Sequence, residues 1–189
     1  ANLIELLTPF ALLVGVTTAA MLAMHGAIYL MMKTEGALQA RAERWLPYLM
    51  GGFVVLQTLI VVASLWLGLS FTDRYFEQIW PVIFPAAALA AMGAVWWFVR
   101  RKEYFYAFVA SSAMILLLIV AAAIGMHPNL IISSIDQAYN LTIYSAASEE
   151  NTMIVALIIA LIGMPFVLLY TAGVYYIFRG KVSIEPESY

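Results

Sequence analysis

Few side chains in this sequence have the type and spacing that chemistry requires. His25 lies in an apolar stretch, where it could titrate, bind a quinone carbonyl, or ligate a haem iron as an axial imidazole. Met24 and Gly26 on either side of it would fit such a pocket. The simpler interpretation is a neutral imidazole that is hydrogen-bonded to a neighbouring helix. We favour this second interpretation, and both stay open at this point.

The other candidates carry less information. His127 precedes Pro128 at the end of an apolar stretch and is most simply an exposed loop histidine. The ten methionines are scattered over apolar segments and are expected to fill the core. The sequence has no cysteine, which excludes thiolate metal ligands and disulfides. Because no phosphate-binding glycine loop, catalytic triad or carboxylate pair can be assembled, we expect no catalytic residue and no metal site in the chain itself.

The composition is that of an integral membrane protein. Of the 189 residues, 65% are hydrophobic and 11% are charged, whereas soluble domains have about 45–50% apolar and about 25% charged residues. This difference excludes a soluble globular protein, a disordered region and a coiled coil. The formal charge of −2 leaves no basic surface for nucleic acid.

The elements that must position these residues are membrane-spanning helices. Five stretches contain no Asp, Glu, Lys or Arg and have about the 20 residues that a helix needs to cross a bilayer. They are residues 9–32, 46–71, 80–99, 104–126 and 152–178. We therefore predict an all-α integral membrane protein, with one transmembrane domain over residues 1–189 that is a bundle of five transmembrane helices. Because ionisable groups within spans usually mark ion paths, their absence here argues against a transporter or channel.

The basic residues predict the orientation. Eight of the nine Lys and Arg residues fall on one side of a five-crossing path, and Arg74 is the exception. The eight are Lys33, Arg41, Arg44, Arg100, Arg101, Lys102, Arg179 and Lys181. By the positive-inside rule, the 33–45 and 100–103 loops and the 179–189 tail are cytoplasmic, and the 127–151 loop and Ala1 are extracytoplasmic.

The ends and loops support further expectations. The chain begins at Ala1 and has no Lys or Arg before Lys33, so its first helix is not a secretory signal. An odd number of helices that starts outside leads us to expect a fragment of a longer protein. After Gly36 the 33–45 loop has good helix formers and should extend the helices past the membrane face. The short 100–103 turn should join its two helices as a tight antiparallel hairpin.

Small residues and prolines predict how the helices pack and bend. Small side chains four residues apart let helix backbones approach closely in lipid. The expected packing residues are Ala86, Ala90 and Ala94 in the third helix, with Ala121 and Gly125 in the fourth. Pro85 and Pro165 should interrupt and kink their helices. Paired broken helices can mark a binding site in transporters, but ordinary kinks are the favoured interpretation.

Several blocks of the sequence resemble subunit II of the cytochrome bd quinol oxidases. They are LTPFALLVG at 7–15, HGAIYLMMKTEG at 25–36, LTIYSAAS at 141–148, PFVLLYT at 165–171 and FRGKV at 178–182. Each block alone is a weak apolar match. Together they cover nearly the whole chain, in the order and with the topology of that family.

The resemblance implies a fold and a set of partners. Subunit II of that family has eight transmembrane helices, so the five helices here would be its fourth to eighth, about half of a pseudosymmetric subunit. The haem ligands and the quinol-oxidising loop belong to subunit I, which would hold haem b and haem d. We therefore expect the haem-carrying subunit I, quinol or a structural quinone, and membrane lipids as partners, with room for a small single-helix subunit. His25 inherits no ligand role, and no cofactor is expected to bind firmly to this chain.

The resemblance also implies a function. The chain would be a non-haem scaffold subunit of a bacterial inner-membrane terminal oxidase, which couples quinol oxidation to the reduction of dioxygen to water in the respiratory chain. Three alternatives stay open: a small transporter or channel subunit, a haem protein with His25 as its ligand, and a membrane assembly factor.

Overall fold

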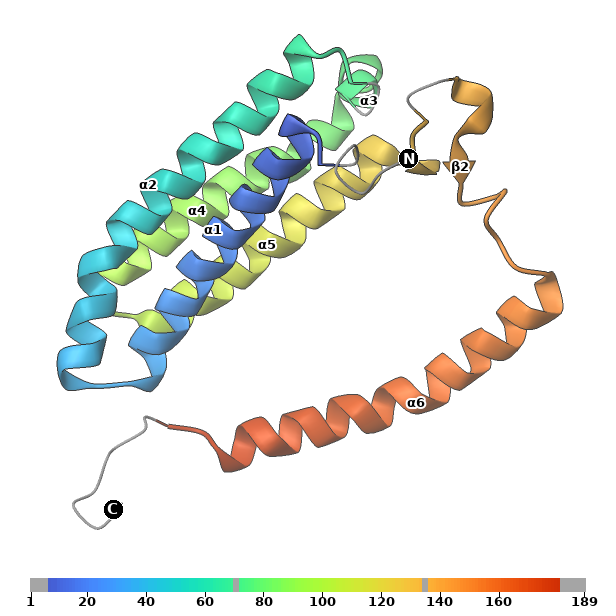
Figure 1. Ribbon diagram of the computed structural model, residues 1–189. Helices are drawn as coiled ribbons and strands as arrows, with labels where there is room; N and C mark the ends of the chain where they lie inside the picture. The colour runs from blue at the N-terminus through green and yellow to red at the C-terminus, as the bar shows by residue number, and fades with distance from the viewer. Residues whose placement is uncertain (1–6, 70–71, 134–135, 181–189) are drawn as a thin grey trace. The chain divides into compact units, whose positions relative to one another are not determined.

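The computed structural model describes residues 7–69, 72–133 and 136–180, and most of these residues are helical (Figure 1). In chain order the elements are α1 (Pro9–Lys33), α2 (Gly36–Trp66), α3 (Asp73–Glu77), η3 (Trp80–Val82), α4 (Ile83–Arg100), α5 (Tyr104–Met126), β1 (Asn129–Ile131), η4 (Gln137–Tyr139), β2 (Leu141–Thr142) and α6 (Glu150–Ile177). Five helices are long and apolar enough to cross a membrane: α1, α2, η3 with α4, α5 and α6. The predicted all-α membrane fold with five spans is confirmed.

The helices extend beyond the apolar stretches of the sequence. The apolar stretch of the second helix begins at residue 46, and the predicted helical extension after Gly36 is confirmed: α2 begins at Gly36, because the backbone hydrogen bonds continue through the polar helix formers that follow this residue. At its other end α2 stops at Trp66, short of the predicted residue 71. Gly68 follows with a φ of +60°, and Leu69 N donates to Ser64 O at 3.1 Å, so the chain turns away there. Residues 70 and 71 lie outside the described residues, as does the predicted cytoplasmic tail from residue 181 onward.

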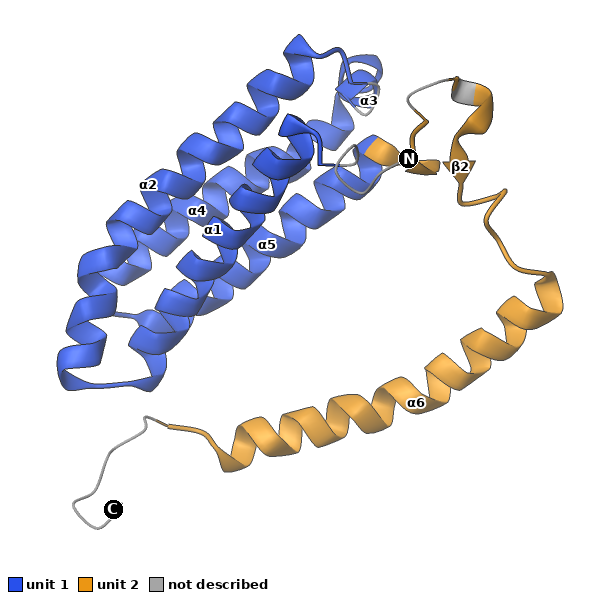
Figure 2. Ribbon diagram, viewed as in Figure 1, with its two compact units in different colours: residues 1–125, 181–189 blue, residues 126–180 orange. Residues whose placement is uncertain are grey.

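The chain divides into two compact units, residues 1–125 with 181–189 and residues 126–180 (Figure 2). The first unit holds α1 to α5, and the second holds β1, β2 and α6. Whether both belong to one transmembrane domain, as the sequence predicts, stays a prediction.

The core of the first unit lies between α1, α2, α4 and α5. Its side chains are almost entirely aliphatic, aromatic or thioether groups, and several of them are methionines, whose flexible side chains fill irregular gaps. The buried members are Met24, Ala27, Ile28, Met31, Ala42, Leu46, Met50, Phe53, Ala88, Met92, Val95, Ala107 and Met114. The predicted role of methionine as core filler is thus confirmed for the five in this set.

The prolines occupy different places in their helices. Pro85 lies in the first turn of α4, where helix N–H groups have no partner within the helix, so it does not interrupt α4 as predicted. Pro165 does lie inside α6. Pro47 lies inside α2 as well, where no kink was predicted. Bending at Pro165 stays a prediction.

The second unit contains a short hairpin in addition to α6. β1 and β2 pair antiparallel, with Asn129 opposite Thr142 and Ile131 opposite Leu141. Ile143 N donates to Pro128 O at 2.9 Å and extends the hairpin beyond the strands. The sequence predicted a 127–151 loop without strands, but these two segments contain β-branched residues that favour extended backbone. Within its own unit α6 has no buried residue among those described.

Candidate functional site

His25 is held by a second helix. Its Nδ1 lies 2.8 Å from Ser111 Oγ in α5, and its ring stacks on Phe108 with centroids 4.7 Å apart and planes at 28°. Tyr29, one turn further along α1, contacts the same Phe108 ring at 5.7 Å. His25 itself is half-buried, whereas Ser111 is completely buried. The hydrogen bond to a neighbouring helix, which the simpler interpretation of His25 requires, is therefore present.

The hydroxyl of Ser111 is linked to the tautomer of His25. Ser111 has one hydroxyl hydrogen, and both the Phe108 carbonyl and Nδ1 of His25 lie 2.8 Å from its oxygen. When the carbonyl receives this hydrogen, the Ser111 oxygen accepts from Nδ1–H, and Nε2 of the neutral imidazole keeps its lone pair as a hydrogen-bond acceptor or a metal ligand. When Nδ1 receives it, Nε2 carries the proton of the ring.

A second polar contact joins α2 to α5 at the end of the bundle that carries Lys33 and Arg100. The hydroxyl of Tyr104 donates to the carboxylate of half-buried Glu43. Pro47 has no N–H, so the Glu43 carbonyl lacks its usual partner four residues ahead. Glu43 thus lacks one backbone hydrogen bond of a regular helix and bonds another helix through its side chain. It lies just before the apolar segment of α2 begins.

A third polar contact lies toward the opposite end of the same unit. The Tyr75 hydroxyl of the short helix α3 donates to the Ala121 carbonyl of α5 at 2.6 Å. Burial raises the pKa of Tyr75 above its ordinary value. This bond satisfies an α5 carbonyl and holds the connection between α2 and α4 against the bundle.

The structure separates the predicted packing residues into two groups. Ala121 and Gly125 are both buried on α5. On α4 the buried residues are instead Ala88, Met92 and Val95, while Ala86 and Ala90 are exposed and Ala94 is half-buried. The Ala86 face of α4 is thus not the face that packs within the first unit, and a packing role against anything else stays a prediction.

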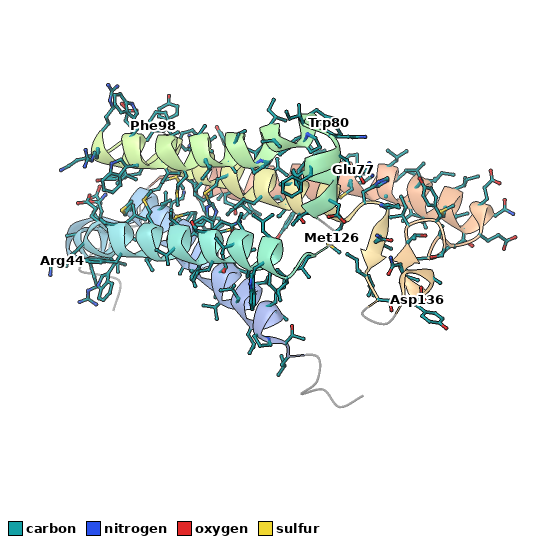
Figure 3. All side chains as sticks on the ribbon, turned by 90° about the horizontal axis from the view of Figure 1, so that it is seen from above. Arg44, Glu77, Trp80, Phe98, Met126 and Asp136 are labelled. Carbon is teal, nitrogen blue, oxygen red and sulfur yellow. The ribbon has the colours of Figure 1, made fainter. Side chains whose placement is uncertain are left out.

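Cationic side chains at helix ends lie over aromatic rings. The guanidinium of Arg100 is 4.5 Å from the centroid of the Trp96 ring, and that of Arg101 is 4.4 Å from Trp97. At the end of α6, Arg179 lies 4.2 Å over Tyr176. In the first unit, Arg44 and Phe98 lie toward one end of the helices and Glu77 and Trp80 toward the other (Figure 3). The two stacked arginines of the α4 end, Arg100 and Arg101, therefore share one end of that unit with Arg44.

The remaining candidate residues do not come together in one site within the described part of the chain. Among the described residues, no three His, Cys, Asp or Glu side chains lie close enough together to hold a metal ion. His127 is exposed, as expected for a loop histidine. The contacts that sequence reasoning missed are those of Ser111, Tyr104 and Tyr75, each an isolated polar side chain in or beside an apolar helix.

Comparison with known proteins identifies the family. The family profile described as cytochrome bd terminal oxidase subunit II matches residues 1–178. The chain belongs to this family. It is 29% identical to cytochrome bd ubiquinol oxidase subunit 2 of Bacillus subtilis, in an alignment that covers 100% of this chain and 55% of the relative. It is 28% identical to cytochrome bd-I ubiquinol oxidase subunit 2 of Escherichia coli K12, over 97% of this chain and 55% of the relative. A probable cytochrome oxidase subunit 2 of Haemophilus influenzae is 31% identical, over 90% of this chain and 52% of the relative.

Two consequences follow from the match. The resemblance deduced from the sequence is confirmed, and this member of the subunit II family is a multi-pass protein of the bacterial inner membrane. The chain spans about half the length of the curated relatives it matches. The predicted orientation, with the basic end in the cytoplasm, stays a prediction.

Proposed function

We propose that this chain is a non-haem scaffold part of a cytochrome bd-type terminal oxidase. The complex would oxidise quinol, reduce dioxygen to water and serve the respiratory chain, with haem b and haem d held by a partner subunit. The observation that carries the proposal is the family match over residues 1–178. The relatives named as ubiquinol oxidase subunits support the same reaction.

The contacts of His25 support a scaffold role rather than a catalytic one. The imidazole is hydrogen-bonded to Ser111 and stacks on Phe108, so it joins α1 to α5 inside the first unit. The five long helices carry Asp, Glu, Lys and Arg only in their terminal turns or, in α2, in the extension before Leu46. A proton or ion path would need ionisable groups further inside. We infer that the spans serve to pack against each other, against lipid and against the haem-carrying subunit.

A quinol contact at His25 is a second proposal, which a specific observation favours. With Nδ1–H donated to Ser111, Nε2 of the neutral ring can only accept a hydrogen bond. A quinol hydroxyl fits this acceptor, whereas a quinone carbonyl does not, because it is an acceptor too. Any quinone species bound here would therefore be held more tightly in its reduced form.

The purified complex is the starting material for testing both proposals, and its optical spectrum tests the oxidase proposal. The complex is purified from native membranes through this chain, and the reduced-minus-oxidised optical spectrum is recorded together with the masses of the subunits. We expect b- and d-type haem bands and a larger, haem-carrying partner, with the same haem content per complex in a His25→Ala variant. A colourless preparation without that partner would refute the oxidase proposal, and solute flux in liposomes would then test the transporter alternative. Haem recovered with the chain alone, and lost in His25→Ala, would instead establish the haem-protein alternative.

The quinol contact has its own readout. Quinone extracted from the purified complex is quantified for the wild type, for His25→Ala and for Thr18→Ala as a matched control on α1, since Thr18 is exposed and bonds only the Val14 carbonyl. We expect less bound quinone in His25→Ala alone. Equal quinone in all three would refute the contact and leave the scaffold role intact.

A further inference from the structure

The turn between α4 and α5 concentrates positive charge at one end of the first unit. We call residues 100–103 the basic turn; it consists of Arg100, Arg101, Lys102 and Glu103, all of them exposed. Two backbone hydrogen bonds close it, from Lys102 N to Val99 O at 3.0 Å and from Glu103 N to Phe98 O at 3.0 Å. These are the paired bonds of a Schellman helix end, so the turn is a defined structure.

Lys102 occupies the position in this turn that normally belongs to glycine. Its φ is +60°, in the left-handed region, where a side chain costs about 1–2 kcal/mol because Cβ approaches the backbone. The equivalent position after α2 is Gly68, with the same φ of +60°. A lysine at the α4 end therefore keeps a positive charge where a glycine would be more stable.

Arg100 and Arg101 lie with their guanidinium groups over the rings of Trp96 and Trp97. Stacking occupies the face of a guanidinium, while its N–H donors lie in the plane of the group and stay available at its edge. A guanidinium held in this way is ready for bidentate binding of a phosphate.

Apolar rings lie next to these cations. Trp97 is 56% exposed, Phe105 61% and Tyr106 56%. Phe98 contacts Tyr106 with centroids 5.5 Å apart, so the ends of α4 and α5 are fixed to each other beside the turn. An exposed apolar surface on the membrane side of a basic turn matches a phospholipid, whose acyl chains adjoin an anionic headgroup.

We propose that the basic turn binds the phosphodiester headgroup of an anionic phospholipid. Arg100 and Arg101 hold the phosphate oxygens, Lys102 adds charge, and the exposed rings contact the acyl chains. The net charge of the turn is positive, since three cations face one carboxylate. The proposal depends on charge complementarity and on these contacts, and it does not depend on the oxidase function.

Native mass spectrometry of the purified complex with added dioleoyl phosphatidylglycerol or dioleoyl phosphatidylcholine tests the proposal. The matched variants are R100Q/R101Q and R41Q/R44Q, because Arg41 and Arg44 are also exposed. Arg44 lies toward the same end of the unit as Phe98 (Figure 3), and Arg41 is in the same helix, α2. A basic residue that lies against an anionic headgroup contributes roughly a fivefold increase in affinity, whereas an exposed charge that does not contact the headgroup is screened by solvent and contributes little. We therefore expect phosphatidylglycerol to bind about 30-fold more weakly to R100Q/R101Q, and binding to R41Q/R44Q to stay within about twofold of the wild type.

A third variant covers the case in which the loss of charge disturbs insertion. R100K/R101K keeps the charge but removes the planar guanidinium edge, so we expect weaker phosphatidylglycerol binding while binding of phosphatidylcholine is unchanged. Equal losses in R100Q/R101Q and R41Q/R44Q would overturn the proposal in favour of a general surface charge. Unchanged lipid binding in R100Q/R101Q and R100K/R101K would overturn it outright, as would release of a bound protein in place of lipid.

Discussion

Replacing Ser111 with alanine and His25 with phenylalanine tests whether one hydrogen bond couples α1 to α5. Phenylalanine keeps a ring against Phe108, where the imidazole now stacks at 4.7 Å, but it removes the Nδ1–H donor. Alanine is close to serine in volume, so at the fully buried Ser111 it removes the acceptor without leaving a large cavity. The two variants together thus isolate the 2.8 Å contact.

The size of the effect follows from the partners that remain in each variant. In His25→Phe, Ser111 still bonds the Phe108 carbonyl, so one net hydrogen bond is lost, at about 0.6 kcal/mol for polar contacts between membrane helices. In Ser111→Ala, Nδ1–H is left unpaired, and the loss should approach the upper value of about 1.7 kcal/mol. The double variant has no donor left to satisfy and should resemble His25→Phe. The coupling energy, which is the sum of the two single effects less the effect of the double variant, is therefore expected at about 1.7 kcal/mol, the size of the Ser111→Ala effect.

Unfolding of the purified chain in mixed micelles, followed by fluorescence against added sodium dodecyl sulfate, measures these differences. Ser112→Ala is the matched control, because Ser112 bonds the same Phe108 carbonyl at 2.9 Å without contacting His25 in the structure. Its effect should add to that of His25→Phe. If His25→Phe and Ser111→Ala are additive to within about 0.3 kcal/mol, the reasoning about this hydrogen bond is refuted.

Three further predictions concern the first unit. Tyr75→Phe removes the 2.6 Å bond to the Ala121 carbonyl and should lower the free energy of unfolding by about 1 kcal/mol. Because burial raises the pKa of Tyr75, the extra stability of the wild type over Tyr75→Phe should be complete at a pH below the ordinary tyrosine pKa of 10.0. It should be lost as the pH rises through the raised pKa of the native state. A stability difference that is equal at low and at high pH would contradict this. Lys102→Gly relieves a φ of +60° and should raise the melting temperature, with a gain of about 1 kcal/mol, whereas an unchanged value would mean that the turn is not strained. Leu46→Ala, at a site 1% exposed, should lower the free energy of unfolding by about 2 kcal/mol. This is the low end of the range for buried leucines, because lipid adds no transfer term. In the same unfolding assay the control Leu59→Ala, at a site 48% exposed, should cost well under half of that.

The number and type of the spans were predictable because their cause is local. A backbone in hydrocarbon must bond within its own segment, so an uncharged apolar run of sufficient length becomes a helix whatever its neighbours are. The helix ends have a different cause, which hydropathy does not detect. α2 extends back through Arg44 and Arg41 to Gly36 because these residues are good helix formers, and it ends just before Gly68, which adopts a positive φ.

The face on which each helix packs was less predictable. A stripe of Ala86, Ala90 and Ala94 was expected to pack, yet within the first unit the buried positions of α4 are Ala88, Met92 and Val95. In a helix that is apolar all round, periodicity has little contrast, so small-residue spacing identifies several faces equally well. The side chains of the neighbouring helices decide among these faces, and that information is not local.

Polar residues distinguish one face of an apolar helix from another. Their distance from the end of the bundle could have predicted the His25 contact. His25 lies eight residues before Lys33, the end of α1, and Ser111 lies seven residues after Tyr104, the start of α5. At 1.5 Å per residue these positions are about 12 and about 10.5 Å from the same end of the bundle. Both ends carry the basic residues that the positive-inside rule assigns to one side, so the two depths can be compared from the sequence alone. Because an isolated polar side chain in an apolar helix gains most from a partner at its own depth, matching depths selects Tyr170 and Thr171 of the last helix and, in α5, the two serines Ser111 and Ser112 as candidate partners for His25. The structure distinguishes the two serines: Ser111 is buried and bonds the imidazole, whereas Ser112, the next residue and half-buried, bonds only the Phe108 carbonyl.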